Sequence, residues 1–201
     1  MVVHRRKERE RLARQKLILA AAIQVFSSKG FHRATMDDVA QKAELGKGTL
    51  YYYFKSKEEI LLKLLEENTR SFFEQLLLAI ESEGNFIQMA RKVLLFYASY
   101  FTEHEVFFNI YFPFESGQIQ LKSTELAEFK QTYLEFRKPL EDRLFQKMEE
   151  ESFETINPQN FWRILGGIVM GINMEIHRKT PLAEIIQMIN QFTAVLEHGL
   201  K

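Results

Sequence analysis

A short segment near residue 50 combines polar and aromatic side chains in a pattern suited to recognising another molecule. It reads Lys47-Gly-Thr-Leu-Tyr-Tyr-Tyr-Phe54. At helical spacing Leu50 and Phe54 stand at positions i and i+4 and share a buried face, so the other side chains lie on or near the exposed side. Tyrosine hydroxyl groups can hydrogen-bond to phosphates or base edges, tyrosine rings can pack on a thymine methyl group, and Gly48 allows the backbone to come close. These residue types indicate contact with nucleic acid.

Two short helices are expected to position this segment. Thr35-Met-Asp-Asp38 is typical of a capping box and predicts a helix from Thr35 to about Ala43. The turn Glu44-Leu-Gly46 separates it from the helix over Lys47–Phe54. Two short helices joined by a three-residue turn, and preceded by a longer helix, form a helix-turn-helix, whose second helix enters a DNA major groove about 12 Å wide.

The whole chain is predicted to be all-α, with about nine helices. Apolar residues recur at spacings of three and four almost throughout, and there are only four Pro. The expected ranges are about 9–29, 35–43, 47–54, 56–80, 86–102, 104–112, a long helix that includes 126–140, 159–178 and 182–199. Ser56-Lys-Glu-Glu59 is typical of a second capping box. Pro113–Gln120 is expected to form a break, and Pro139 to kink the long helix, because proline lacks the amide donor.

Charges are distributed unevenly along a chain whose formal net charge is zero. Of 201 residues, 27 are Lys or Arg and 27 are Asp or Glu. Residues 1–57 hold 13 basic and 5 acidic side chains and residues 58–201 hold 14 and 22, so the two parts carry +8 and −8. This division suggests that the first part faces a polyanion. An alternative for Arg5–Lys16 is a solvated helix start, because Glu8 and Glu10 interleave with its basic residues at pair-forming spacings.

Several motifs together resemble the N-terminal signature of the TetR family of transcriptional repressors. They are Gly48-Thr-Leu-Tyr-Tyr-Tyr-Phe54, Lys55-Ser-Lys-Glu-Glu-Ile-Leu62, Ile18-Leu-Ala-Ala-Ala-Ile-Gln-Val-Phe26, Gly30-Phe-His-Arg-Ala-Thr35 and Asp38-Val-Ala40, within roughly residues 10–65. The resemblance implies a helix-turn-helix DNA-binding domain, residues 1–55, and a larger helical effector-binding and dimerisation domain, residues 56–201. It also implies a homodimer that binds a palindromic operator in double-stranded DNA and is released by a small ligand.

Two positions depart from the family's pattern. The family usually has Gly at the position of Glu44, and Ser or Thr at that of Gly46. A non-glycine residue held at positive φ in the turn would cost of order 1 kcal/mol, and Gly46 would cap the recognition helix without a side-chain hydroxyl. The local geometry of the turn is therefore a point for the structure to decide.

The resemblance also implies which residues contact DNA. They are Thr35, Lys47, Gly48, Thr49, Tyr51, Tyr52, Tyr53 and Lys57. Thr35 and Lys57 would hold phosphates, residues 47–49 would approach base edges, and the three tyrosines would share both kinds of contact. Three alternatives remain: Thr35 caps a helix with or without phosphate, Lys57 is a solvated charge, or the Tyr53 ring rests against the helix at 9–29 or 56–80.

Aromatic residues are concentrated between Phe96 and Phe114, where nine of the 26 in the chain fall within 19 residues. An aromatic-lined ligand pocket is one explanation, and its expected residues are Phe96, Tyr97, Tyr100, Phe101, Phe107, Phe108 and Tyr111. The other explanation is core packing of a helical domain. Because few charged residues accompany these aromatics, the expected effector is small and largely apolar or aromatic, for example acyl-like.

Three glycines, Gly166, Gly167 and Gly171, lie inside an apolar helix, where each costs about 1 kcal/mol relative to Ala. Something should therefore require a close approach of the backbone. A second copy of the chain is the expected partner, since TetR-like proteins dimerise through their last two helices. Tight packing within one chain is the alternative.

Other functional classes find little support in the sequence. There is no Cys, the five His are scattered, and no catalytic or nucleotide-binding motif is present, so neither an enzyme nor a metal or cofactor site is expected. No apolar run is long enough to span a membrane, and a cytoplasmic protein is expected. The alternative function is a helix-turn-helix DNA-binding protein that is regulated by a protein partner or acts architecturally, without a small-molecule effector.

Overall fold

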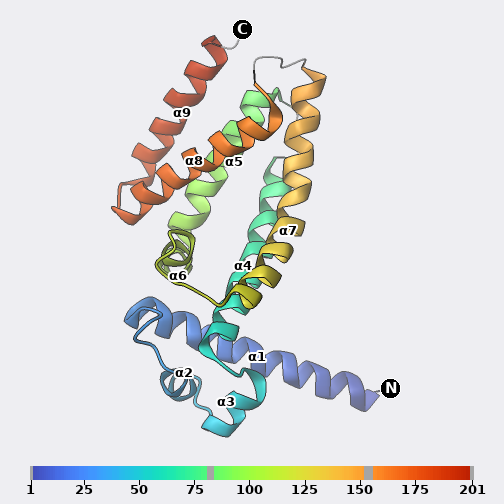
Figure 1. Cartoon of the computed structure of the whole chain (residues 1–201), viewed down its shortest axis with the longest axis vertical. Coiled ribbons are helices and arrows are strands. Elements are labelled where there is room, and N and C mark those ends of the chain that lie inside the picture. Colours follow the sequence, from blue (N-terminus) through green and yellow to red (C-terminus); the bar gives the residue numbers. More distant parts are fainter. Residues whose placement is uncertain (1, 81–83, 152–155, 200–201) are drawn as a thin grey trace. The chain divides into compact units, whose positions relative to one another are not determined.

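The computed structural model describes residues 2–80, 84–151 and 156–199, and within these ranges it contains nine helices and no strand. Figure 1 shows their order. They are α1 (Val2–Lys29), α2 (Met36–Lys42), α3 (Lys47–Tyr53), α4 (Lys57–Ala79), α5 (Phe86–Glu103), α6 (Glu105–Glu115), α7 (Ser123–Glu150), α8 (Pro158–His177) and α9 (Leu182–Gly199). The prediction of an all-α fold is confirmed. Among these helices none combines the length and apolarity of a bilayer span.

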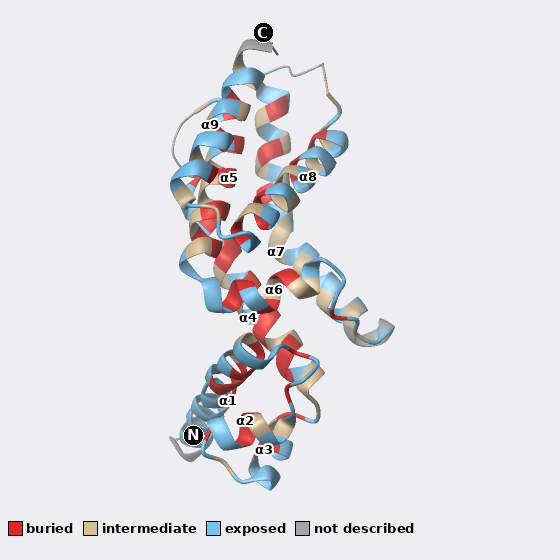
Figure 2. Cartoon of the chain, turned by 90° about the vertical axis from the view of Figure 1, so that its left-hand side faces the viewer, coloured by how far each residue is buried: buried red, intermediate tan, exposed pale blue. Residues whose placement is uncertain are grey.

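The chain forms two compact units, and α4 and α7 contribute to both. The first unit extends to Asn68 and includes Val106–Phe129. Within it α1 packs on α2, and α2 on α3. Figure 2 colours the buried residues of these helices red. The core residues include Ile18, Ala22, Phe26, Val39, Leu50, Phe54, Leu61 and Leu65. Burial of this apolar set fixes which sides of α1, α2 and α3 are left exposed.

The second unit comprises Thr69–Glu105 and the chain from Lys130 onward. Within it α5 packs on both α8 and α9, which also contact each other. The ring of Phe72 in α4 lies at the centre of an aromatic cluster, with ring centroids 5.1–5.7 Å from four rings of α5. Those rings are Phe96, Tyr97, Tyr100 and Phe101. Aromatic pairs at such distances stabilise a core beyond the burial of their area.

Several helix ends lie where local side chains satisfy the free backbone amides. The Thr35 hydroxyl accepts from the Asp38 amide, and the Asp38 carboxylate accepts from the Thr35 amide, which completes the expected capping box of α2. The Asn157 side chain caps α8, with Pro158 in its first turn. The start of α8, close to the residue 159 expected from the sequence, therefore has a local cause.

The starts of α1 and α4 differ from the expectations. Helix α1 begins at Val2 and not near Arg9, because charged pairs such as Arg6–Glu10, 2.9 Å apart, support an exposed helix without an apolar stripe. In α4 the Ser56 hydroxyl accepts from the Glu59 amide as expected, but the Glu59 carboxylate accepts from the Lys55 amide. The capping box there is displaced by one residue.

The break expected at Pro113–Gln120 begins later, because α6 continues through Pro113 to Glu115. Proline removes one amide donor, yet the Ser116 amide still bonds to the Phe112 carbonyl at 2.9 Å. Gly117, with φ of 77°, then follows the helix, in the left-handed conformation that glycine adopts without steric cost.

Candidate nucleic-acid interface

The turn between α2 and α3 forms a helix-ending motif that depends on Glu44. The Leu45 amide donates to the Ala40 carbonyl at 2.9 Å, and the Glu44 amide to the Gln41 carbonyl at 3.1 Å. These two bonds define a Schellman motif, which requires a left-handed residue just after the helix. Glu44 is that residue, with φ of 55°. The turn thus keeps its geometry although a glutamate occupies the glycine-favouring position, at the cost expected from the sequence.

Helix α3 presents one buried and one exposed side. Gly46 forms its N-cap without a side-chain hydrogen bond, and Leu50 and Phe54 are buried as predicted. Tyr52 is 73% exposed and Tyr51 45% exposed, both high values for large side chains. Lys47, Gly48 and Thr49 are also exposed. Tyr53 is half-buried and its ring meets that of Tyr52 edge to face, with centroids 5.1 Å apart.

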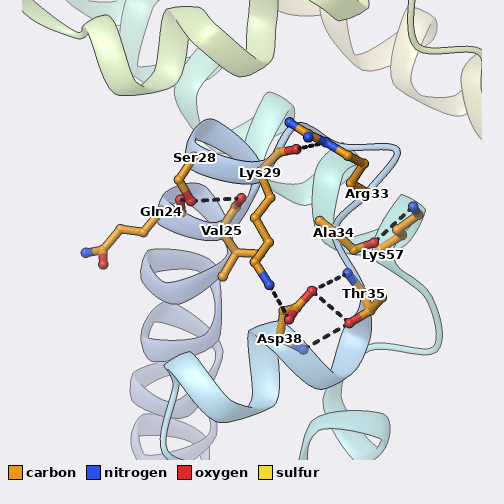
Figure 3. Close-up of polar contacts among 9 residues, drawn as sticks. All are labelled: Gln24, Val25, Ser28, Lys29, Arg33, Ala34, Thr35, Asp38 and Lys57. Carbon is orange, nitrogen blue, oxygen red and sulfur yellow. Dashed lines mark hydrogen bonds and ion pairs between the residues drawn. The ribbon is translucent and has the colours of Figure 1, made fainter.

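Two acidic residues in the first turn of α2 hold basic residues on neighbouring helices. The Asp37 carboxylate lies 2.5 Å from the Lys47 ammonium and raises the pKa of that lysine. The Asp38 carboxylate lies 2.5 Å from the Lys29 ammonium (Figure 3). The hydrogen bonds from Lys29 and then from Thr35 lower the pKa of Asp38. The sequence analysis did not predict the ion pair between Asp37 and Lys47. The preference of acidic residues for helix N-termini could have indicated Asp37 as a partner for a nearby basic residue.

Lys57 is turned toward the loop that joins α1 to α2. Its ammonium donates to the carbonyls of Phe31, His32 and Ala34 at 2.9–3.1 Å, and it also lies 4.7 Å from the centroid of the Phe31 ring. Figure 3 shows Lys57 beside Ala34, directly before the capping Thr35. Lys57 thus stabilises the loop that leads into α2, so a phosphate would compete with three carbonyl groups for its ammonium.

The other expected site residues fall into three groups. Phe96, Tyr97, Tyr100 and Phe101 meet at Phe72 in the second unit, with Phe96 half-buried and the others buried. Phe107, Phe108 and Tyr111 belong to α6 in the first unit. Gly166, Gly167 and Gly171 are exposed in α8, and a Cβ built on any of them would meet no atom of the described chain within 4 Å.

Residues 18–64 match the family model described as bacterial regulatory proteins, tetR family. The N-terminal part of this chain is a TetR-family domain. The matched residues contain α2, the turn and α3, and most of the stretch that carries the sequence resemblance. The exposed side of α3 therefore lies inside the TetR-family domain.

Curated relatives match mainly the N-terminal part of the chain. The chain is 37% identical to the fatty acid metabolism regulator protein of Bacillus subtilis over 59 residues, 29% of the chain and 30% of the relative. The chain spans about a third of the length of the first curated relatives it matches.

Solved structures resemble the chain over most of its length. The regulator FadR of Bacillus subtilis, in complex with stearoyl-CoA, has a TM-score of 0.73 at 21% identity, covering 90% of this chain and 96% of that one. A candidate fatty acid metabolism regulator of Clostridium perfringens has a TM-score of 0.69 at 25% identity, covering 92% and 98%. The TetR-type fold thus extends well beyond the N-terminal match.

Proposed function

We propose that this chain is a cytoplasmic transcriptional repressor that binds a palindromic operator as a homodimer and is released by an acyl-type ligand. The observation that carries the DNA-binding part is the exposed side of α3. It offers tyrosine hydroxyl groups, a threonine and bare glycine backbone, while Leu50 and Phe54 anchor the helix to the core. Such a helix suits direct reading of a major groove.

Within this proposal the residues divide by role. Gly48 and Thr49 approach base edges together with Lys47, which leaves Asp37 for a phosphate or a base. Tyr51, Tyr52 and Tyr53 share contacts with phosphates and bases, and Thr35 adds a phosphate contact to its role as helix cap. Lys57 acts first by fixing the loop before α2, and it reaches a phosphate only by leaving the carbonyls of that loop.

Operator binding is tested by selecting genomic fragments that bind the protein and then measuring affinities by gel shift. Tyr52→Ala should weaken binding by about 1–3 kcal/mol, because it removes a base-reading or phosphate-binding side chain without disturbing the core. Leu78→Ala, at a site 66% exposed in the α4 part of the second unit, is the control and should bind like the wild type. Equal affinity for Tyr52→Ala and wild type would refute the assignment of α3.

Dimerisation is supported by an exposed apolar set on the last two helices. It comprises Ile164 and Met174 in α8 and Met188 and Val195 in α9. Among the described residues the three exposed glycines of α8 have no close neighbour that would explain their cost, so packing within this part of the chain does not account for them. A second copy packed on α8 and α9 would cover this set and place two recognition helices on a two-fold operator.

The ligand class is supported by the aromatic cluster around Phe72 and by the names of the relatives. The Bacillus subtilis match is a fatty acid metabolism regulator, and the solved FadR of that species is in complex with stearoyl-CoA. Stearoyl-CoA should raise the melting temperature of this chain and release the operator fragment. No effect on either property would favour a regulator that responds to a protein partner.

A further inference from the structure

Asn173 in α8 is a fully buried polar residue with one polar atom left over. Its side-chain exposure is 0%, and its Oδ1 accepts a hydrogen bond from the Tyr97 hydroxyl of α5 at 2.8 Å. Its Nδ2 has no hydrogen-bond partner among the described residues. Turning the amide over would only exchange the atoms, because Nδ2 would then face the hydroxyl and the carbonyl oxygen would be left over.

A buried amide with unused donors is costly. Such a group loses its bonds to water without a replacement, whereas leucine, of similar size, would pack in an apolar core without that loss. Both neighbours of Asn173 in the sequence, Ile172 and Met174, are apolar. The position therefore offers a hydrogen bond that the described residues do not use, beside a cluster of aromatic side chains.

The surroundings select the kind of acceptor that would use this donor. The ring centroid of Tyr97 lies 5.6 Å from that of Phe72 and 4.6 Å from that of Phe101. A neutral amide among aromatic rings suits an uncharged carbonyl oxygen on an apolar chain, since burial of a carboxylate or phosphate demands a paired cation.

We propose that the Tyr97–Asn173 pair is the polar anchor of the effector site and that the Asn173 amide donates to the acyl carbonyl oxygen of the ligand. This inference rests on the proposed acyl-responsive function. Two sources share the carbonyl: a thioester and a free fatty acid. The anchor favours the thioester, because the carboxyl group of a free acid carries a charge at neutral pH. Tyr97 holds the amide in place from α5, and the aromatic cluster receives the apolar chain.

The experiment compares three ligands by isothermal titration calorimetry on the full chain. Stearoyl-CoA has the carbonyl, S-octadecyl-CoA replaces it with a methylene group but keeps the chain and the nucleotide, and stearate carries the charged carboxylate. The wild type should bind stearoyl-CoA about tenfold more tightly than the thioether, as expected for one neutral hydrogen bond, and more tightly than stearate. Equal affinity for thioester and thioether would overturn the anchor. Tighter binding of stearate than of stearoyl-CoA would mean that the site takes a free fatty acid, and it would overturn the thioester assignment.

Variants separate recognition from a purely structural role. Asn173→Leu should fold with an unchanged or higher melting temperature and bind thioester and thioether equally. Tyr97→Phe keeps the ring but releases the amide, so it should reduce the discrimination even if Asn173→Leu does not fold. Thr193→Val removes another buried polar group, whose hydroxyl bonds to the Ile189 carbonyl at 2.9 Å, and it should leave the discrimination unchanged.

The outcomes distinguish the anchor from the function on which it rests. A folded Asn173→Leu or Tyr97→Phe that still discriminates as the wild type does would show that Asn173 is structural, for example through a buried water, and would overturn the anchor. If neither CoA ligand binds the wild type, the anchor and the acyl effector fail together, whereas gel shift still measures operator binding by itself. If stearoyl-CoA binds and releases the operator but the thioether binds equally tightly, the acyl effector stands and only the anchor fails.

Discussion

At the scale of single residues, Lys57 shows how one side chain serves both the fold and the proposed site. Its ammonium bonds to three carbonyls of the loop between α1 and α2, which leads into the cap of α2. The alternatives considered from the sequence were a phosphate contact and a solvated charge. The observed contacts add a third role, the stabilisation of the loop, which must be separated from any contact with DNA.

We predict that Lys57→Ala lowers the free energy of unfolding by about 1–2 kcal/mol, because three carbonyl groups lose a charged donor. Urea unfolding without DNA measures this effect. Lys55→Ala is the control: its ammonium bonds to one exposed carbonyl, that of Tyr51, at 3.0 Å, and the loss should be within about 0.5 kcal/mol. Unchanged stability of Lys57→Ala would mean that the loop bonds contribute nothing, and would leave the phosphate contact and the solvated charge as the two roles of Lys57.

At the scale of elements, the turn before α3 and the cap of α2 decide how the recognition helix is presented. Both are local structures, and each depends on one acidic residue: Glu44 in the left-handed position of the turn and Asp38 in the capping box. The two residues differ in their effect. Glu44 adds strain to the element, whereas Asp38 stabilises it.

We predict that Glu44→Gly raises the free energy of unfolding by about 1 kcal/mol, because glycine adopts positive φ without a clash of its Cβ. Glu74→Gly, at an exposed position within α4, is the matched control and should lower it by about 1 kcal/mol. Thermal or urea unfolding of the two variants measures both changes in the free energy of unfolding, which should have opposite signs. Destabilisation by both substitutions would contradict a strained Glu44.

The pKa of Asp38 predicts a dependence of stability on pH. Lys29 and Thr35 hold the pKa of Asp38 in the folded chain below its ordinary value of 3.8. The stabilisation by this carboxylate is therefore present above about pH 4 and is lost as the pH falls through the folded pKa. Wild type should exceed Asp38→Asn in stability at neutral pH, and the difference should shrink below about pH 4. Urea unfolding at several pH values measures it, and a difference independent of pH would contradict the role of the charge.

At the scale of the whole molecule, the chain divides into two units that contain different proposed sites. The first contains the helix-turn-helix, and the second contains the aromatic cluster, the Tyr97–Asn173 pair and the exposed side of α8 and α9. The helix-turn-helix lies in the basic part of the sequence, because residues 1–57 carry +8 and residues 58–201 carry −8. The affinity of such a molecule for DNA should depend on the basic groups near the phosphates and not on the net charge of the chain, which is zero.

We predict that the wild type sediments at micromolar concentration with about twice the 23.8 kDa mass of one chain. Ile164→Glu should shift it toward monomer, because a charge on the exposed apolar side of α8 would be buried without a partner at the interface. Leu78→Glu introduces the same charge at an exposed site of α4 and should leave the dimer intact. Sedimentation velocity decides, and a monomeric wild type would rule out the dimer.

The sequence by itself determined what depends on neighbouring residues. Apolar spacing predicted the all-α fold, Thr35 and Asp38 predicted the cap of α2, and the positions of Leu50 and Phe54 predicted which side of α3 is exposed. Helix periodicity and capping act over a few residues, so a single sequence contains the information. Helices α1 and α6 were predicted too short, because ion pairs support the exposed start of α1 without an apolar stripe and α6 continues past Pro113.

Only the tertiary structure decided which distant residues meet. Lys57 bonds to carbonyls some 25 residues earlier in the chain, and Asn173 meets Tyr97 across 76 residues. The aromatic residues that looked like one group in the sequence belong to two units, four around Phe72 and three in α6. The physical reason is that such contacts arise from the packing of helices far apart in the sequence, and neither residue type nor spacing encodes the partner.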